Sequence, residues 1–365
     1  MTSNQTRLLT IVILAVLVSG GAMAALVFLQ PETSPPVDPF VTIFGTGGTS
    51  QNVTFTEMLS MTAVTGNSSY QNSYGNVGGT GIYTGVKVSD LVDLVGGMSE
   101  SYLLRVVASD DYSQTFEYAK VYPNATYLAI QGDMILAYEY NGSTVPNYES
   151  GFRLAFIPDD GYYSSADANA TTDPNPVAAG PQWVANVAKL EILKNLYTET
   201  LELSESFLRT LPNVTGEGGY LKKDGITIVG PFNYTGVPFS VLLQQFSTIP
   251  DDYIIKSLSG DAYTNEYTKS VVEGELSGYT PTRDPLTSIN STMVLAYEEN
   301  GTAIVDGGPL KIVFLNEDGN LTDGFRWAKD VVSLTILEVE SSTPMLSSQL
   351  DFTVELLMIT SRNQR

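Results

Sequence analysis

Two acidic loops carry the side chains of this chain that are best suited to hold a metal ion. One loop has the sequence Asp-Asp-Gly at residues 159–161 and is followed by Asp167 and Asp173; the other has Glu-Asp-Gly at residues 317–319 and is followed by Asp323. Clustered carboxylate oxygens are hard ligands of the kind that Ca²⁺ prefers. The spacing differs from that of an EF-hand, and acidic turns are also common as plain solvated loops, so both interpretations stay open. The candidate calcium ligands are Asp159, Asp160, Asp318 and Asp323.

Other residues that usually carry catalysis are absent, because the chain contains no cysteine and no histidine. Without cysteine there are no disulfides and no thiolate chemistry, so each domain depends on its hydrophobic core. Without histidine, the commonest general base and the commonest transition-metal ligand are missing. Serine–histidine–aspartate and cysteine–histidine sites are therefore excluded, and carboxylate pairs cannot be assigned to a common cleft from sequence alone.

The net charge restricts the partners. The chain has 40 acidic and 18 basic residues, which gives a formal net charge of −22. Such a surface is repelled by nucleic acids and by anionic lipid surfaces. We therefore expect no nucleic-acid partner, and we expect cations, glycans or other surface proteins as ligands.

Tyrosine is abundant, with 21 residues. Exposed tyrosine rings suit sugars or protein interfaces, whereas alternating tyrosines in strands also pack at the edge of a core. The glycine-rich stretch 75–81 lacks the lysine and the helix start of a phosphate-binding loop and is interpreted as a flexible loop. Two local sets of tyrosines stand out, namely Tyr70, Tyr74 and Tyr83, and Tyr138, Tyr140, Tyr148, Tyr162 and Tyr163.

Asparagine occurs in Asn-x-Ser/Thr sequons more often than the serine and threonine content alone would give, which indicates N-glycosylation of an exported surface. Loops rich in serine and threonine also generate sequons by chance. Asn4 has the motif but precedes the N-terminal apolar segment, on the side that we expect to stay in the cytoplasm. The predicted glycosylation sites are Asn52, Asn67, Asn124, Asn141, Asn169, Asn213, Asn233, Asn290, Asn300 and Asn320.

The N-terminus predicts a membrane anchor. Arg7 precedes an uncharged apolar run over residues 8–29, which is long enough for one crossing. A cleavable signal peptide is the alternative, since residues 22–24 (Ala-Met-Ala) form a small-x-small site, but the apolar run continues beyond it. The charge asymmetry places residues 1–7 in the cytoplasm and the acidic bulk outside the cell. Residues 30–40 are rich in proline and predict a short stalk.

The rest of the chain is a tandem repeat. Tyr-Thr-Gly-Val at residues 83–86 recurs at 234–237, and Leu-Ala-Tyr-Glu at residues 136–139 recurs at 295–298. Separations of about 150 residues indicate two copies of a whole domain, because solenoid repeats are roughly 20–50 residues long. We predict a first domain over residues 41–196, a second over 197–340 and a C-terminal extension over 341–365.

Each copy reads as a β-rich α+β domain with two short helices. The expected helices are residues 57–61 and 205–211, capped by Thr56 and Ser204, and residues 90–95 and 241–246, capped by Ser89 and Ser240. The expected strands are 102–108 and 253–258, the Leu-Ala-Tyr-Glu strands with an Asn-Gly turn, 152–157 and 310–315, and 183–193 and 327–337. Residues 345–359 are expected to add a strand or to pack across the two domains.

The order of these motifs resembles the oxidoreductase molybdopterin-binding domain, the fold of the catalytic domain of the sulfite oxidase family. The resemblance rests on Gly-Val before a short helix, the Leu-Ala-Tyr-Glu-x-Asn-Gly hairpin and a tryptophan ahead of the last strand, over residues 41–193 and 201–337. It implies two tandem sulfite-oxidase-like domains behind a single N-terminal transmembrane helix. In enzymes of this family a cysteine thiolate ligates molybdenum, from a position that corresponds to residues 73–83 and 226–234. Neither stretch contains cysteine, and the histidines that help hold the pterin are missing, so the resemblance implies the fold and not the activity.

These observations predict a single-pass, membrane-anchored extracellular glycoprotein that is not an enzyme and holds no molybdopterin. Its two domains would serve binding, adhesion or envelope structure, and calcium is the one metal left open. Two alternatives remain: an exported molybdopterin-dependent oxidoreductase with altered metal ligation, and a subunit of a surface filament or lattice. The sequons, the lack of disulfides and the acidic composition are typical of an archaeal cell surface.

Overall fold

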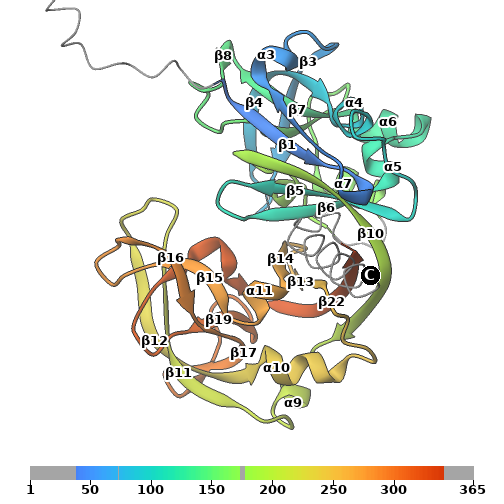
Figure 1. Cartoon of the computed structure of the whole chain (residues 1–365). Coiled ribbons are helices and arrows are strands. Elements are labelled where there is room, and N and C mark those ends of the chain that lie inside the picture. Colours follow the sequence, from blue (N-terminus) through green and yellow to red (C-terminus); the bar gives the residue numbers. More distant parts are fainter. Residues whose placement is uncertain (1–37, 73, 173–176, 341–365) are drawn as a thin grey trace, which may run out of the picture. The chain divides into compact units, whose positions relative to one another are not determined.

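A computed structural model describes residues 38–72, 74–172 and 177–340 of the chain as a β-rich α+β fold with several sheets (Figure 1). The predicted cytoplasmic tip, the anchor over residues 8–29, nearly all of the stalk and the extension over 341–365 lie outside the described residues. Among the described residues, no helix is long and apolar enough to cross a membrane. The described residues from Phe40 onward belong to one compact unit.

The first repeat supplies one group of strands and helices. Its strands are β1 (Phe40–Phe44), β2 (Ser50–Thr54), β3 (Ala63–Gln71), β4 (Val77–Lys87), β5 (Tyr102–Ala108), β6 (Ser113–Glu117), β7 (Asp133–Tyr140), β8 (Ser143–Thr144), β9 (Arg153–Ile157) and β10 (Val187–Glu202). Its helices are η1 (Thr46–Gly48), α3 (Phe55–Met58), α4 (Val88–Asp93), α5 (Tyr118–Val121), α6 (Ala125–Gln131), α7 (Ser165–Ala170) and α8 (Ala179–Gln182).

The second repeat follows a similar order. Its strands are β11 (Val214–Leu221), β12 (Ile228–Pro238), β13 (Tyr253–Ser259), β14 (Thr264–Thr268), β15 (Glu275–Tyr279), β16 (Pro285–Asn290), β17 (Thr292–Glu299), β18 (Thr302–Ala303), β19 (Lys311–Leu315), β20 (Thr322–Asp323), β21 (Ala328–Lys329) and β22 (Val331–Glu340). Its helices are α9 (Glu205–Leu208), α10 (Phe239–Leu242), η2 (Leu243–Gln245), α11 (Lys269–Val272) and η3 (Gly324–Arg326).

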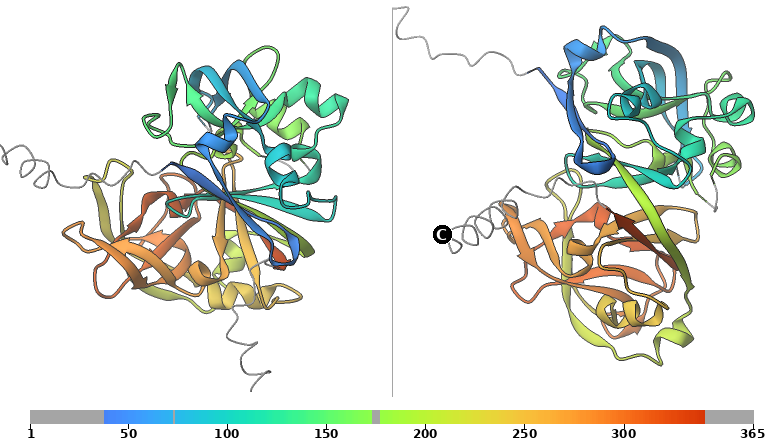
Figure 2. Two further views of the ribbon diagram at one scale, coloured as in Figure 1. Left: turned by 45° about the horizontal axis from the view of Figure 1, so that its top comes forward. Right: turned by 45° about the vertical axis from the view of Figure 1, so that its right-hand side comes forward.

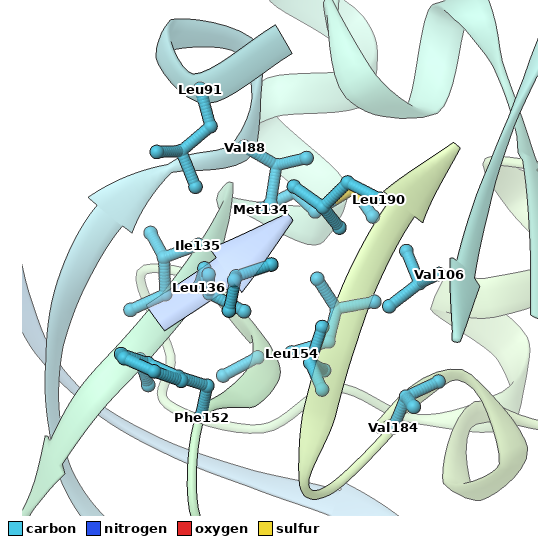
Figure 3. Close-up of a cluster of buried hydrophobic side chains, with 14 of the residues drawn as sticks. Val88, Leu91, Val106, Met134, Ile135, Leu136, Phe152, Leu154, Val184 and Leu190 are labelled. Atoms are coloured by element: carbon cyan, nitrogen blue, oxygen red, sulfur yellow. The ribbon is translucent and has the colours of Figure 1, made fainter. Parts of the chain in front are cut away.

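Each repeat builds its own hydrophobic core. The main cluster of the first repeat is drawn from residues 41–192, and that of the second from residues 208–336. In the first core, Ile135, Leu136 and Leu154 of neighbouring strands are fully buried beside Leu190 of β10 (Figure 3). Burial of this apolar area is the main favourable term for a chain that has no disulfides.

The repeated Tyr-Thr-Gly-Val motif has a steric explanation in the sheets. β4 pairs with β7 and β12 pairs with β17, and both pairs shift register at the glycine of the motif. A Cβ atom on Gly85 would lie 2.2 Å from the Leu136 carbonyl oxygen, and one on Gly236 would lie 2.3 Å from the Leu295 carbonyl oxygen. Only glycine therefore lets the two backbones approach this closely.

Replacement of Gly85 by alanine should disrupt the β4–β7 pairing and lower the free energy of unfolding by about 3 kcal/mol. Chemical denaturation measures this loss. Gly142→Asn is the control, because Gly142 sits in the hairpin turn at φ 81° and its Cβ position has no neighbour within 4 Å. Asparagine tolerates this left-handed conformation. Equal losses in both variants would contradict the steric explanation.

Strand β10 joins the two repeats. It runs without interruption over 16 residues, pairing with β1 and β5 through its first half and with β22 through its second (Figure 2). The predicted last strand of the first repeat, residues 183–193, ends too early, because β10 continues to Glu202. The predicted domain boundary between residues 196 and 197 lies inside β10, where the pairing with β22 shifts register between Asn195 and Tyr197.

The same sheet also brings the repeats together at β6 and β14. The carboxylate of Glu266 in β14 accepts hydrogen bonds from the backbone nitrogen and the hydroxyl of Thr115, at 2.6 Å each, and from the Ser113 hydroxyl at 3.1 Å. Beside it, Gln114 Nε2 donates to the Thr264 carbonyl, and the Thr264 hydroxyl donates back to Gln114 Oε1. All five bonds join β6 to β14, so the edge strand of the first repeat is fixed to that of the second.

Several local predictions hold and others do not. Ser204 caps α9 as predicted, and the Asn-Gly turns close both predicted hairpins. Thr56 is not a cap, because Thr54 two residues earlier forms a capping box with Glu57. α4 and α10 begin one residue before Ser89 and Ser240, so neither serine is an N-cap. The stretch 75–81 is not simply a loop, since β4 begins at Val77.

Lys120 places a charge inside the first core. This residue of α5 is 2% exposed, and its Nζ lies 5.3 Å from the centres of the Phe156 and Tyr163 rings. Nζ donates hydrogen bonds to the hydroxyls of Thr171 and Thr172. Burial lowers the pKa of Lys120 from 10.5 to about 7, although Glu117 and Asp167 act in the opposite direction.

We expect Lys120→Met to raise the free energy of unfolding near pH 7, on the order of 2–4 kcal/mol. Between pH 7 and 10.5 the unfolded chain binds this proton and the folded chain does not. The free energy of unfolding of the wild type therefore increases with pH in this window. The difference in this free energy between Lys120→Met and the wild type should become smaller. Denaturation at pH 7 and pH 9.5 measures the difference, with Lys223→Met on the exposed surface as the control. A stability difference between the variant and the wild type that does not change with pH would contradict the lowered pKa of Lys120.

Candidate functional site

A cleft of about 850 Å³ is the candidate site, and we call it the aromatic cleft. Residues of both repeats line it, including Tyr70, Arg153 and Trp183 of the first and Tyr279, Asp323 and Phe325 of the second. The tips of the β3–β4 and β11–β12 hairpins also contribute, with Tyr74 from one and Lys222 and Lys223 from the other. A concave surface with aromatic walls and a few charged groups is typical of a ligand-binding site.

The wall in the first repeat is an aromatic set with an arginine against it. The Trp183 ring lies 5.0 Å from the ring of Tyr70 and 5.3 Å from that of Tyr83. The Arg153 guanidinium lies 5.4 Å from the Tyr70 ring and 5.9 Å from the Trp183 ring. Its two terminal nitrogens donate to the hydroxyls of Ser150 and Tyr70, at 3.2 and 3.4 Å. No salt bridge to Arg153 is present among the described residues.

Two hydrogen-bond donors in this wall have no acceptor among the described residues. Arg153 Nε and Trp183 Nε1 are both buried and have no hydrogen-bond partner in the part of the chain that the structure describes. The Trp183 side chain is only 3% exposed. Buried polar groups are nearly always paired, and an unpaired one costs about 1–3 kcal/mol. Two unpaired donors beside one cleft therefore point to a ligand that accepts hydrogen bonds.

The second repeat contains the same aromatic set with its polar groups satisfied. Trp327 lies 4.9 Å from Tyr220 and 5.6 Å from Tyr234, as ring centroids. Here Trp327 Nε1 donates to the Thr322 hydroxyl at 2.7 Å. Lys311, at the sheet position that corresponds to Arg153, pairs with Glu299 at 3.0 Å.

The register explains this difference between the repeats. Glu299 lies opposite Tyr234, and the corresponding residue opposite Tyr83 is Tyr140. The hydroxyl of Tyr140 donates to the Thr80 carbonyl, so it supplies no negative charge to Arg153. The first repeat thus keeps a cation without a carboxylate where the second repeat has an ion pair.

The second repeat contributes an acidic side chain, Asp323, to the cleft. Burial raises the pKa of the Asp323 carboxyl, and the nearby Asp110 and Asp111 act in the same direction, while Tyr279 and Arg326 oppose them. The Tyr279 hydroxyl donates to Asp323 Oδ1 at 2.9 Å. The cleft therefore contains acidic as well as basic groups.

The acidic loops of the sequence do not gather into one site. Asp159 and Asp160 are exposed, and Asp160 Oδ1 accepts from the backbone of Tyr162 in its own turn. Asp318 is exposed as well, whereas Asp323 lies in the aromatic cleft. Within the described residues, no group of three acidic side chains is arranged to hold a metal ion. Asp173 lies outside the described residues, and calcium binding stays a prediction.

The tyrosine sets divide between core and cleft. Tyr83, Tyr138, Tyr148 and Tyr163 are buried, whereas Tyr70 and Tyr74 line the cleft, with Tyr74 85% exposed. Sequence reasoning did not find Arg153, Trp183 or Lys120 as candidate site residues. A comparison of the two repeats position by position would have shown that Arg153 in the first corresponds to Lys311 in the second, and Tyr140 to Glu299.

Comparisons with known proteins give a weak similarity of fold. No protein-family model matches the chain, and no curated relative matches it. Among solved structures, the chain is similar to the sulfane dehydrogenase SoxCD from Paracoccus pantotrophus, with a TM-score of 0.30 and 13% sequence identity. The match covers 83% of this chain and 77% of that one. The function is therefore inferred from the geometry of this chain alone.

Most of the predicted glycosylation sites are accessible. Eight of the ten predicted asparagines are exposed, and Asn169 and Asn320 are half-buried. The side-chain oxygen of Asn169 also accepts a hydrogen bond from the backbone of Val177 at 2.7 Å. Occupancy of the sites stays a prediction.

In protein isolated from its native source, we expect glycans at the exposed sequons and little or none at Asn169, because a half-buried, hydrogen-bonded amide is a poor acceptor. Peptide mass spectrometry gives the occupancy of each site. Unmodified asparagine at every exposed sequon would contradict the predicted glycosylation, and full occupancy of Asn169 would contradict the role of burial.

Proposed function

We propose that this chain is a membrane-anchored, extracellular binding protein that recognises an acidic sugar through the aromatic cleft. The proposal joins the predicted N-terminal anchor and sequons to the geometry of the cleft. In this account the two repeats act as a scaffold and carry out no reaction. Sulfite-oxidase-like ancestry of the repeats is part of the proposal.

One observation carries the choice of ligand. The two repeats share an aromatic framework, yet within the described residues Arg153 of the first has no carboxylate partner and Trp183 has no hydrogen-bond acceptor, whereas Lys311 and Trp327 of the second have both. A carboxylate on the ligand would give Arg153 an anionic partner and Trp183 Nε1 an acceptor, since a carboxylate accepts several hydrogen bonds and pairs with a guanidinium. In the second repeat Glu299 pairs with Lys311, which supports the choice of a carboxylate as the partner of Arg153.

A sugar ring suits the rest of the cleft. Tyr74 and Phe325 offer aromatic faces to a ligand, and polar groups such as Asn72 and Asn186 can bond to hydroxyls. The chain as a whole repels anions, but Lys222, Lys223 and Arg283 also line this cleft with Arg153. These cations offset the acidic residues that line the same cleft, so an anionic sugar can enter.

The residues of this chain do not fit a molybdenum cofactor. The stretches that correspond to the cysteine ligand of the resembled family, residues 73–83 and 226–234, contain glycine, threonine, tyrosine and aliphatic side chains and no thiolate. In the first of them the Tyr83 hydroxyl is already used, because it donates to the Gly79 carbonyl. Hydroxyl and amide oxygens do not replace soft thiolate coordination. A binding role is therefore favoured over the alternative of an oxidoreductase.

Binding of oligogalacturonate and of the matched neutral galacto-oligosaccharide to the purified protein tests the proposal. We expect the acidic oligosaccharide to bind at least tenfold more tightly, and Arg153→Gln and Trp183→Phe to weaken it at least tenfold. Isothermal titration calorimetry measures both affinities. A tenfold loss corresponds to about 1.4 kcal/mol, the range of one charge-assisted hydrogen bond.

The second repeat provides matched controls. Lys311→Gln removes the same charge as Arg153→Gln, and Trp327→Phe removes the same ring nitrogen as Trp183→Phe. Both should leave the affinity within a factor of two. Equal losses from the variants of the two repeats, or equal binding of acidic and neutral sugars, would overturn the proposal.

A further inference from the structure

A second cavity, distinct from the aromatic cleft, lies against the shared sheet. It has a volume of about 890 Å³ and is lined by strands of both repeats, among them β5, β6, β10, β13 and β22. Aliphatic and aromatic side chains, including Phe116, Val177 and Leu337, make up part of its wall. The rest is polar, and Lys120 belongs to it.

Lys120 is a cation without a matching anion at this wall. Among the described residues, no carboxylate forms a salt bridge with Lys120 Nζ, which donates hydrogen bonds to the hydroxyls of Thr171 at 2.5 Å and Thr172 at 3.2 Å. Glu117 and Asp167 attract it electrostatically without a salt bridge, and Asp167 Oδ2 accepts hydrogen bonds from the backbone and hydroxyl of Ser164. A buried charge without an anionic partner is costly.

The fold itself does not require this cation. α5 follows β6 as α11 follows β14, and the third residue of each helix is Lys120 in one repeat and Val271 in the other. Val271 is buried in the core of its repeat. The first repeat thus holds a lysine where an aliphatic residue serves the same fold, and it does so at the edge of a cavity.

We propose that this cavity binds an amphipathic monocarboxylate, with its carboxylate on Lys120 Nζ and its apolar chain against Phe116, Val177 and Leu337. The carboxylate would form the ion pair that Lys120 lacks among the described residues, and the apolar chain would cover the apolar part of the cavity wall. A single carboxylate matches the one positive charge of Lys120 Nζ. A dianion would leave a second charge beside Glu100, Glu117 and Glu202, which also line the cavity.

Binding of this ligand is coupled to a proton. Because burial holds the pKa of Lys120 at about 7, the free amine predominates at pH 8 when the cavity has no ligand. A carboxylate favours the ammonium form, so its binding at pH 8 should take up close to one proton. The other titratable groups that face Nζ are Glu117, Asp167 and Tyr163. The affinity should be highest near pH 6–7 and should fall roughly tenfold per pH unit above that.

Titration of the full-length protein with octanoate tests the inference, with 1-octanol and octylamine as probes of equal chain length. We expect octanoate to bind at least tenfold more tightly than either, and calorimetry at pH 8 in two buffers of different ionisation enthalpy to show uptake of a proton. Lys120→Met should abolish the preference for octanoate and the proton uptake. Its unfolding curve shows directly that the variant is folded.

Two further variants test whether octanoate binds to Lys120 and not to another cationic side chain. Lys256→Met removes another lysine from the same cavity wall, and Arg153→Gln alters the aromatic cleft. Both should bind octanoate as the wild type does. Unchanged octanoate binding by Lys120→Met, equal binding of octanoate and octanol, or no binding of octanoate at millimolar concentration would each overturn the inference.

Discussion

The pairing of β10 on both halves of its length is the constraint on which the remaining structure depends. One end of this strand presents Leu190 and Ile192 to the first core, and the other pairs with β22, whose Leu334 and Ile336 belong to the second. A slip of one residue would turn the side chains of both regions to the wrong face. The aromatic cleft and the second cavity use residues of both repeats, so both depend on this register.

Sequence patterns found the parts of the fold that local chemistry determines. The Asn-Gly turns, the Leu-Ala-Tyr-Glu strands and the Ser204 cap are encoded within a few residues, and each is where the pattern predicts it. The continuity of β10 was missed because its middle is polar and half-exposed, as in a linker. The proximity of Arg153 to Trp183 was not predictable, since it depends on strand register across the sheet and not on spacing.

The two repeats also act as controls for one another. Positions that keep the same residue, such as Gly85 and Gly236, are explained by the backbone contacts that both copies need. Positions that differ, such as Arg153 and Lys311, are not explained by the fold, because each copy folds with its own residue. A buried donor left unpaired in one copy and paired in the other therefore carries information about ligands rather than about stability.

The place of β1 in the sheet has a mechanical consequence. β1 lies between β2, to which it is antiparallel, and β10, to which it is parallel, with Ile43 paired to Leu190 and Phe44 to Glu191. A pull on the N-terminal end of β1, along the strand, loads these hydrogen bonds together in shear instead of opening them one after another. Tension that enters the chain at this end would therefore pass directly into β10, the strand that both repeats share.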